Sequence, residues 1–270
     1  MRIESFGKSD VGKCREKNED SFLINEDFHL YIVADGMGGH LGGEYASRLA
    51  VNTIEEVVKS VENDPEATMP ESDELRPDDY AGILRYAIAV ASRRIFEKAQ
   101  NDPALHGMGT TSVVVLFRHN KVYIANVGDS RVYHIRKDKI SQVTKDHSLV
   151  EEQVRAGILS AKDSRSHRFK NIITRSVGYQ EGVESDVDIR VPHIGDRYLL
   201  CSDGLSNLIE DEDIKDIVAN NGLKEAAERL IDVANERGGE DNITAVLIEV
   251  KGLDEEDEVD TLSSESTIEA

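Results

Sequence analysis

Residues 31–40, with the sequence YIVADGMGGH, constrain the fold of this chain more than any other stretch. The apolar run at residues 30–34 has the length and β-branched content of a buried strand. Asp35 follows it, and three of the next four residues are glycines, which allow a sharp turn and a close approach of the backbone to a ligand. A carboxylate held beside the bare carbonyl of Gly36 suits a hard divalent cation. An ordinary Asp-Gly turn between a strand and a helix explains the same residues, so this stretch alone leaves both interpretations open.

Composition limits the class of protein. The length of 270 residues allows one large domain or two small ones. Lys and Arg number 32 against 53 Asp and Glu, and the net charge of -21 argues against nucleic acid or an anionic membrane surface as partner. No apolar run approaches the ~20 residues that span a bilayer, and residues 1–5 lack the apolar core of a signal peptide. Two cysteines, Cys14 and Cys201, make no disulfide framework, so a cytoplasmic location is expected.

Changes in hydrophobic period predict the order of the structural elements. β-branched or alternating runs predict strands, and apolar residues three or four apart predict amphipathic helices. Strands are expected at residues 3–8, 21–25, 29–34, 112–117, 121–126, 131–136, 187–191, 197–201 and 243–250. Helices are expected at residues 43–63, 80–101, 149–156, 211–219 and 223–236. This order is typical of an α+β fold with largely antiparallel sheets.

Carboxylates recur at the predicted strand ends. Asp20 precedes a strand, Asp35 and Asp203 follow strands, Asp241 precedes the last strand, and Asp129 lies between two strands. A single aspartate of this kind usually only stabilises a turn, whereas several at strand ends indicate that they converge at one edge of the fold. Oxygen ligands favour magnesium or manganese over zinc, and no Cys/His spacing predicts a zinc site. Two such ions could activate a shared water and hold a phosphoryl group.

Three side chains near these carboxylates have two interpretations each. The guanidinium of Arg15 suits a phosphate ligand, but a surface ion pair explains it equally. Cys14, beside Arg15, could be a redox-sensitive thiolate, although a packed cysteine is the simpler interpretation. Cys201 lies inside an apolar strand and is expected in the core.

Six motifs occur in an order that resembles a known family. They are REKNED at 15–20, DGMGGH at 35–40, GMGTT at 107–111, NVGDSR at 126–131, SDGL at 202–205 and DNIT at 241–244. Together they resemble the motif series of the type 2C metal-dependent protein serine/threonine phosphatases, in the bacterial style. The resemblance covers roughly residues 1–250, and the remaining residues 251–270 form an acidic tail that is expected to be disordered.

The resemblance implies a fold and a reaction. The fold would be a four-layer α-β-β-α sandwich, with two mostly antiparallel β-sheets flanked by helices. The reaction would be hydrolysis of phosphoserine and phosphothreonine in proteins by a water activated between two Mn²⁺ or Mg²⁺ ions, without a phosphoenzyme. Arg15 would bind the substrate phosphate, and Asp129 with Asp203 would hold a third, weaker ion.

The resemblance also implies which residues bind the two principal ions. Asp35 would bridge them, and the carbonyl of Gly36 would be a further ligand. Asp20 would serve one ion, and Asp203 and Asp241 the other, partly through water.

Two departures from the family concern the leaving group and the substrate. Animal members carry a histidine after the Asp-Gly pair as a candidate general acid, whereas this chain has Met37, which cannot transfer a proton. That role is therefore vacant, or it passes to water or to His40, which could equally only stabilise the turn. The segment 145–178 resembles the family's flap, a surface segment expected to be mobile, at HSLV 147–150, RAG 155–157 and NIITR 171–175. Its middle, residues 161–170, diverges, so substrate choice does not follow from relatives.

Three functions remain open from the sequence. The complete set of carboxylates favours an active phosphatase. Its expected substrates are proteins phosphorylated by a Ser/Thr kinase, and it is expected to act as a monomer. A metallophosphatase for small phosphorylated metabolites fits the divergent flap. A non-catalytic module that binds phosphorylated partners would be expected to have lost some of these carboxylates, and none is missing. The Pro-punctuated loop at residues 62–79 and the Ser/Thr cluster in the tail could dock a partner or be modified, or could have neither role.

Overall fold

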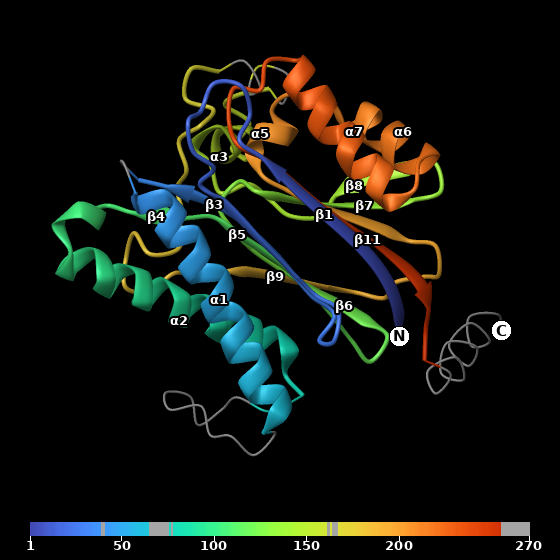
Figure 1. Cartoon of the computed structure of the whole chain (residues 1–270), viewed down its shortest axis with the longest axis horizontal. Helices are drawn as coiled ribbons and strands as arrows, with labels where there is room; N and C mark the ends of the chain where they lie inside the picture. Colours follow the sequence, from blue (N-terminus) through green and yellow to red (C-terminus); the bar gives the residue numbers. More distant parts are fainter. Residues whose placement is uncertain (39–40, 65–75, 77, 161–162, 164–166, 255–270) are drawn as a thin grey trace.

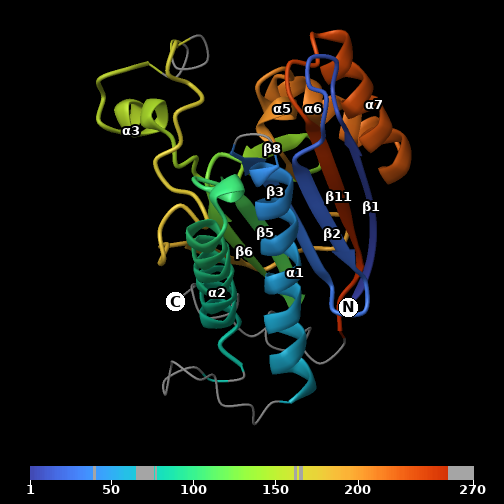
Figure 2. The same ribbon diagram turned by 60° about the vertical axis from the view of Figure 1, so that its left-hand side comes forward.

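A computed structural model of the chain describes residues 1–38, 41–64, 76, 78–160, 163 and 167–254. Two β-sheets face each other, and helices cover the outer face of each sheet (Figures 1 and 2). All strand pairings between the named elements are antiparallel. The predicted α+β fold, an α-β-β-α sandwich, is confirmed. His40, most of the loop at 62–79 and the tail from residue 255 lie outside the described residues.

The first sheet joins the two ends of the described chain. Its strands, in spatial order, are β1 (Arg2–Asp10), β11 (Ile243–Gly252), β10 (Arg197–Cys201), β7 (Arg131–Arg136) and β8 (Lys139–Gln142). On its outer face lie the short helix α5 (Asp203–Ser206), α6 (Asp211–Asn220) and α7 (Leu223–Glu236) (Figure 1).

The second sheet carries the stretch that opens the sequence analysis. Its strands, in spatial order, are β2 (Asp20–Asn25), β3 (Leu30–Met37), β5 (Ser112–Arg118), β6 (Lys121–Val127) and β9 (Asp186–Arg190), and β4 (Gly109–Thr110) pairs with the end of β3. Two long helices cover it, α1 (Gly42–Asn63) and α2 (Tyr80–Asn101), and η1 (Pro103–Leu105) follows α2. The helix α3 (Leu149–Arg155) stands away from the sheets (Figure 2).

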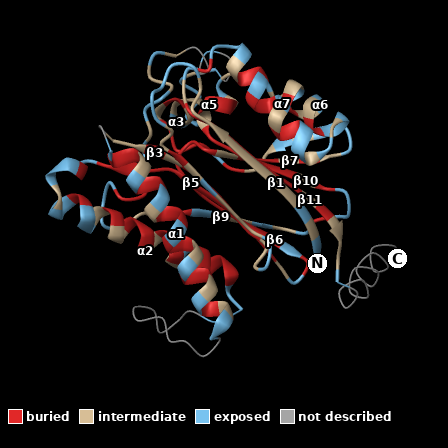
Figure 3. Cartoon of the chain, in the orientation of Figure 1, coloured by how far each residue is buried: buried red, intermediate tan, exposed pale blue. Residues whose placement is uncertain are grey.

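The central strands are apolar on both faces because each face is covered. In β3, Leu30, Ile32 and Ala34 pack under α1 and α2, while Tyr31 and Val33 pack between the two sheets. A strand that is covered on both faces has apolar residues in a continuous run, whereas a strand with one face in solvent alternates apolar and polar residues. Figure 3 shows the result, with buried residues on the sheets and on the inner faces of the helices.

The structure corrects several predicted boundaries. The second strand begins at Asp20 and the third continues to Met37, so Asp20 and Asp35 lie inside strands rather than beyond their ends. The short strands β4 and β8 were not predicted. The hairpin turn between β5 and β6 is confirmed, with positive φ at His119 and Asn120. Within the described residues, no helix is long and apolar enough to cross a membrane.

Candidate active site

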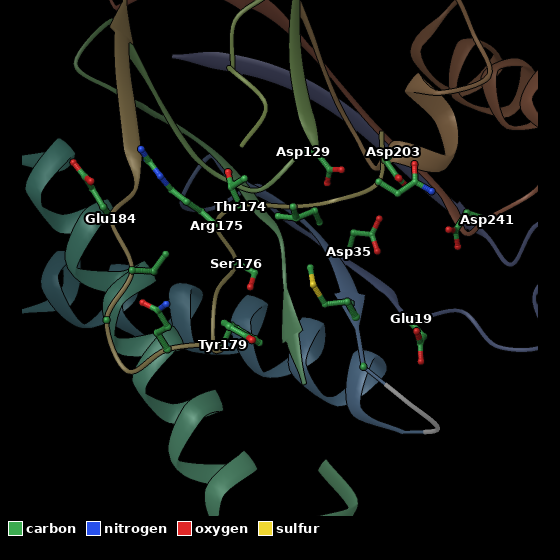
Figure 4. Close-up of a pocket in the computed structure, with 18 of the residues that line it drawn as sticks. Glu19, Asp35, Asp129, Thr174, Arg175, Ser176, Tyr179, Glu184, Asp203 and Asp241 are labelled. Carbon is green, nitrogen blue, oxygen red and sulfur yellow. The ribbon is translucent and has the colours of Figure 1, made fainter. Parts of the chain in front are cut away.

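A cavity of about 930 Å³ gathers four of the five aspartates that the sequence singles out. Asp35, Asp129, Asp203 and Asp241 line one side of it, together with Glu19 (Figure 4). The opposite side is formed by residues of the segment 171–184, among them the labelled Arg175, Tyr179 and Glu184. Four strand-end aspartates far apart in sequence therefore share one pocket.

Asp35 is held in place through its backbone. Its amide donates to the hydroxyl of Thr111 at 2.9 Å, and its carbonyl accepts from the amide of Thr111 at 2.9 Å and from the hydroxyl of Thr110 at 2.8 Å. The GMGTT motif thus fixes the strand that carries Asp35. The side chain of Asp35 lines the pocket.

Gly36 is required by a close backbone contact. A Cβ atom at this position would lie 2.1 Å from the carbonyl oxygen of Gly43 and 2.6 Å from that of Glu19. The amide of Gly36 also donates to the carbonyl of Glu19 at 3.2 Å. Any side chain here would push β3 away from the start of α1, and so only glycine keeps the Gly36 backbone at the pocket wall.

Asp20 joins the two sheets behind the pocket. It is the register partner of Asp35 in the β2–β3 pair. Its Oδ2 atom accepts hydrogen bonds from the hydroxyls of Ser202 at 2.8 Å and Thr244 at 2.6 Å, which belong to the other sheet's side of the sandwich. Its Oδ1 atom is buried without a partner in the described structure. A buried carboxylate oxygen without a donor is costly unless something else satisfies it.

Asp203 and Asp241 come from the ends of two neighbouring strands. Asp203 begins α5 directly after β10, and Asn207 donates to its Oδ2 at 3.1 Å. Asp241 precedes β11, and its Oδ2 accepts from the guanidinium of Arg15 at 2.7 Å. Arg15 is thus in an ion pair, as the plainer interpretation of the sequence expected, but its partner is one of the pocket carboxylates.

Asp129 reaches the pocket from a tight turn. The preceding residue, Gly128, has a φ of 101°, which a side chain would strain. Behind Asp129, Arg131 at the start of β7 makes a partly buried ion pair with Asp146 at 2.7 Å. The charge of Arg131 is therefore already neutralised by Asp146.

The described side chains supply too little positive charge to balance the carboxylates of the pocket. Burial, and then the charges of neighbouring aspartates, raise the pKa values of Asp35, Asp129 and Asp203 above the usual range. Burial raises the pKa of Asp20 to about 7, although the hydroxyls of Thr244 and Ser202 work against this rise. A set of acids that repel one another in a recessed site favours a bound cation.

The donor set fits hard divalent cations. It consists of carboxylate and carbonyl oxygens, which suit Mg²⁺ and Mn²⁺, and the orphaned Oδ1 of Asp20 indicates an unmet demand for positive charge. Among the described residues, no three acidic, histidine or cysteine side chains lie close enough together to hold a metal ion by themselves. An open arrangement of this kind is typical of ions that keep several water ligands.

Three contributions to the site were missed from the sequence. Glu19 lines the pocket, and burial raises its pKa. Asn242 fastens the loop before β2, since its Oδ1 accepts from the amide of Glu19 at 2.8 Å and its Nδ2 donates to the carbonyl of Lys17 at 2.8 Å. Ser202 orients Asp20. Each of the three is the sequence neighbour of an aspartate in one of the six motifs. This position beside a motif aspartate was the only sign in the sequence that they belong to the site. Cys201 is buried as predicted, and Cys14 is exposed.

Comparison with known proteins agrees with this architecture. A family model described as Protein phosphatase 2C matches residues 5–243. The serine/threonine phosphatase stp of Listeria welshimeri is 38% identical over 246 residues, which cover 90% of this chain and 94% of that protein. The structure of serine/threonine phosphatase Stp1 from Staphylococcus aureus matches with a TM-score of 0.82 at 31% identity, over 93% of this chain and 96% of that one. The catalytic domain of the phosphatase PstP, in complex with two manganese ions, matches with a TM-score of 0.79 at 33% identity, over 93% and 99%.

A two-sheet sandwich that collects buried carboxylates from both sheets defines a metal-dependent phosphatase. The chain belongs to the protein phosphatase 2C family. The prediction of a metal-dependent protein serine/threonine phosphatase of bacterial style, made from six short motifs, is confirmed.

Proposed function

We propose that this phosphatase hydrolyses phosphoserine and phosphothreonine in proteins by direct attack of water, with no phosphoenzyme intermediate. The observation that carries the proposal is the cluster of mutually repelling carboxylates of Asp35, Asp129 and Asp203, which line one open pocket. Such a cluster is poorly suited to bind an anionic phosphate by itself. It becomes suited once cations offset its charge.

Five residues would hold two Mn²⁺ or Mg²⁺ ions. Asp35 would contact both, with the carbonyl of Gly36 beside it, and Asp20 would serve one of them through its unpartnered Oδ1. Asp203 and Asp241 would serve the other. When bound, the ions supply activation of the attacking water and neutralisation of the phosphoryl oxygens.

Two further roles follow from the same pocket. Asp129, whose nearest acidic neighbours include Asp203, would help to hold a third, weaker ion. Arg15 would bind the substrate phosphate with its fork of donors, and its ion pair with Asp241 keeps the guanidinium at the pocket edge until the phosphate arrives. Met37 lines the pocket and cannot donate a proton to the leaving hydroxyl. Proton transfer by His40 stays a prediction.

The wider setting is proposed from the sequence. The catalytic domain would span residues 1–250 and act as a monomer on substrates of a Ser/Thr kinase, with residues 251–270 as an acidic tail outside it. Cytoplasmic location stays a prediction.

The decisive experiment is hydrolysis of a phosphothreonine peptide during titration of manganese against a chelator. The proposal expects turnover that requires the metal and falls at least about a hundredfold in Asp203→Asn. The matched control is Asp138→Asn, an exposed aspartate in the turn between β7 and β8, which should keep wild-type turnover.

Other outcomes would replace the proposal. Hydrolysis of sugar phosphates, with none of phosphopeptides, would favour the metallophosphatase for small metabolites. Manganese binding without release of phosphate from either a peptide or an aryl phosphate would leave the non-catalytic binding module.

A further inference from the structure

A second cavity, of about 940 Å³, lies along β9, which is the last described strand of its sheet. We call it the β9 groove and define it by Arg85, Asn126, Lys145, Glu184, Ser185 and Val187. Its walls come from α2, the end of β6 and the residues that follow β8. β8 is likewise the last described strand of the other sheet, so the groove lies where both sheets of the sandwich end.

Two buried polar side chains in the β9 groove lack partners. Asn126 is 2% exposed and its Oδ1 accepts no hydrogen bond, while its Nδ2 donates to the carbonyl of Lys145 at 2.8 Å. Ser185 is 7% exposed and its Oγ has no partner either. Buried polar atoms are nearly always satisfied in folded proteins. Two orphans in one groove therefore indicate a polar ligand.

The charges of the groove favour an acidic ligand. Asp186 already pairs with Arg175 at 3.1 Å, and Asp188 with Arg190 at 2.8 Å. Arg85 and Lys145, in contrast, make no ion pair within the described part of the chain, and Glu184 is the one other charged residue lining this cavity that is unpaired there. The uncommitted charge is positive, in a chain whose net charge is -21. Complementarity of charge selects partners in this way.

The β9 groove continues the active-site cavity. Val183 and Glu184 line both. In Figure 4, Glu184 lies at the opposite end of the active-site cavity from Asp241. A polypeptide with its phosphorylated residue among the carboxylates can therefore pass Glu184 and run along β9. At about 3.3 Å per residue, the five residues of β9 match about five residues of an added strand.

We propose that the β9 groove binds an extended acidic segment of the protein substrate, a few residues from the phosphorylated residue, as a strand added to β9. The inference rests on the proposed function and names the class of substrate for it. Backbone groups of the segment pair with the free edge of β9, and its acidic side chains meet Arg85 and Lys145. Asn126 and Ser185 provide polar atoms for its backbone.

Six substrates test the inference with one pair of variants. They are an aryl phosphate, a five-residue phosphothreonine peptide, and that peptide extended by ten acidic or ten basic residues, each extension made on either side. The variant is Arg85→Glu with Lys145→Glu, and the matched control is Lys121→Glu with Lys224→Glu, two exposed lysines outside the groove.

We expect KM of the wild type to be about tenfold lower for one acidic extension than for the short peptide, with kcat unchanged. The groove variant should lose this advantage and favour the basic extension, whereas the control variant should keep the wild-type order. The change should be confined to extended peptides, because the aryl phosphate and the short peptide do not reach Lys145.

The failures of the two proposals are distinguishable. Equal KM for short and extended peptides, with intact turnover of the aryl phosphate, would overturn the β9 groove and leave the phosphatase mechanism standing. If no substrate is turned over, anisotropy with a labelled, unphosphorylated acidic peptide still tests the groove, and binding that the groove variant does not weaken overturns it.

Discussion

Replacing Asp20 with asparagine is expected to stabilise the metal-free protein while removing its activity. Burial, reinforced by the charges of Asp203 and Asp241, raises the pKa of this carboxyl from 3.8 to about 7, despite hydrogen bonds from Thr244 and Ser202. Without a cation, the folded protein must keep Asp20 protonated or hold a buried negative charge among other carboxylates. Asparagine has nearly the same shape and no charge, so it removes that conflict.

The pKa change gives the sign and the size of the effect. Each tenfold change in proton affinity is worth about 1.4 kcal/mol, so the rise from 3.8 to about 7 corresponds to about 4 kcal/mol. A carboxyl with a raised pKa stabilises the folded state fully below pH 3.8, and this contribution is lost as the pH rises through about 7. About 2.5 kcal/mol of the loss falls between pH 5 and pH 8. Asparagine at position 20 has no proton to titrate between pH 5 and pH 8, so this part of the pH dependence is absent from the variant.

Urea unfolding in the presence of a chelator, at pH 5 and pH 8, measures this difference. The unfolding free energy of Asp20→Asn relative to wild type should rise by about 2.5 kcal/mol between the two pH values. Asp27→Asn, in the exposed turn between β2 and β3, should follow wild type within about 0.5 kcal/mol. The reasoning is refuted if Asp20→Asn and wild type lose stability in parallel over this range.

Three further predictions concern the metal, the glycine turn and the partly buried ion pair. Manganese at about a hundredfold its Kd should stabilise the wild type by about 2.7 kcal/mol in thermal unfolding and leave Asp35→Asn nearly unchanged; equal shifts would contradict a role for Asp35 in binding. Gly36→Ala should cost about 3 kcal/mol in urea unfolding, because its Cβ would lie 2.1 Å from a backbone oxygen, and a loss below 0.5 kcal/mol would contradict that contact. Asp146→Asn should cost about 2 kcal/mol in the same assay, since it leaves the partly buried Arg131 without its anionic partner; an unchanged midpoint would show that Arg131 is solvated.

Much of the fold could be predicted because its signals are local. The apolar run of β3 and the spaced apolar residues of α1 identify their elements without reference to the rest of the chain. β8 was missed because its sequence, KISQ, has a single apolar residue, and it pairs with β7 at the sheet edge. β3 was ended too early because Gly36 usually stops a strand, whereas pairing with β4 carries it on to Met37.

The aspartates of the candidate site could be predicted from the sequence, but the residues that hold them in place could not. Asp35, Asp203 and Asp241 stand out by their position beside apolar strands, and the structure brings them to one pocket. The hydroxyl of Thr244 that orients Asp20 lies 224 residues away in sequence, and no local pattern reports such a contact. The β9 groove could not be predicted from the sequence for the same reason, since segments far apart in the sequence form it.

The pairing of β1 with β11 has a consequence during synthesis on the ribosome. Asp10 of β1 lies opposite Ile243 of β11, so the first strand has to wait until a partner more than two hundred residues further along the chain has been made. Asp241, two residues before the start of β11, completes the pocket at the same stage. A growing chain therefore stays inactive towards the phosphoproteins around it until the sandwich closes, and a chain that stops before residue 241 has neither a complete sheet nor a complete site.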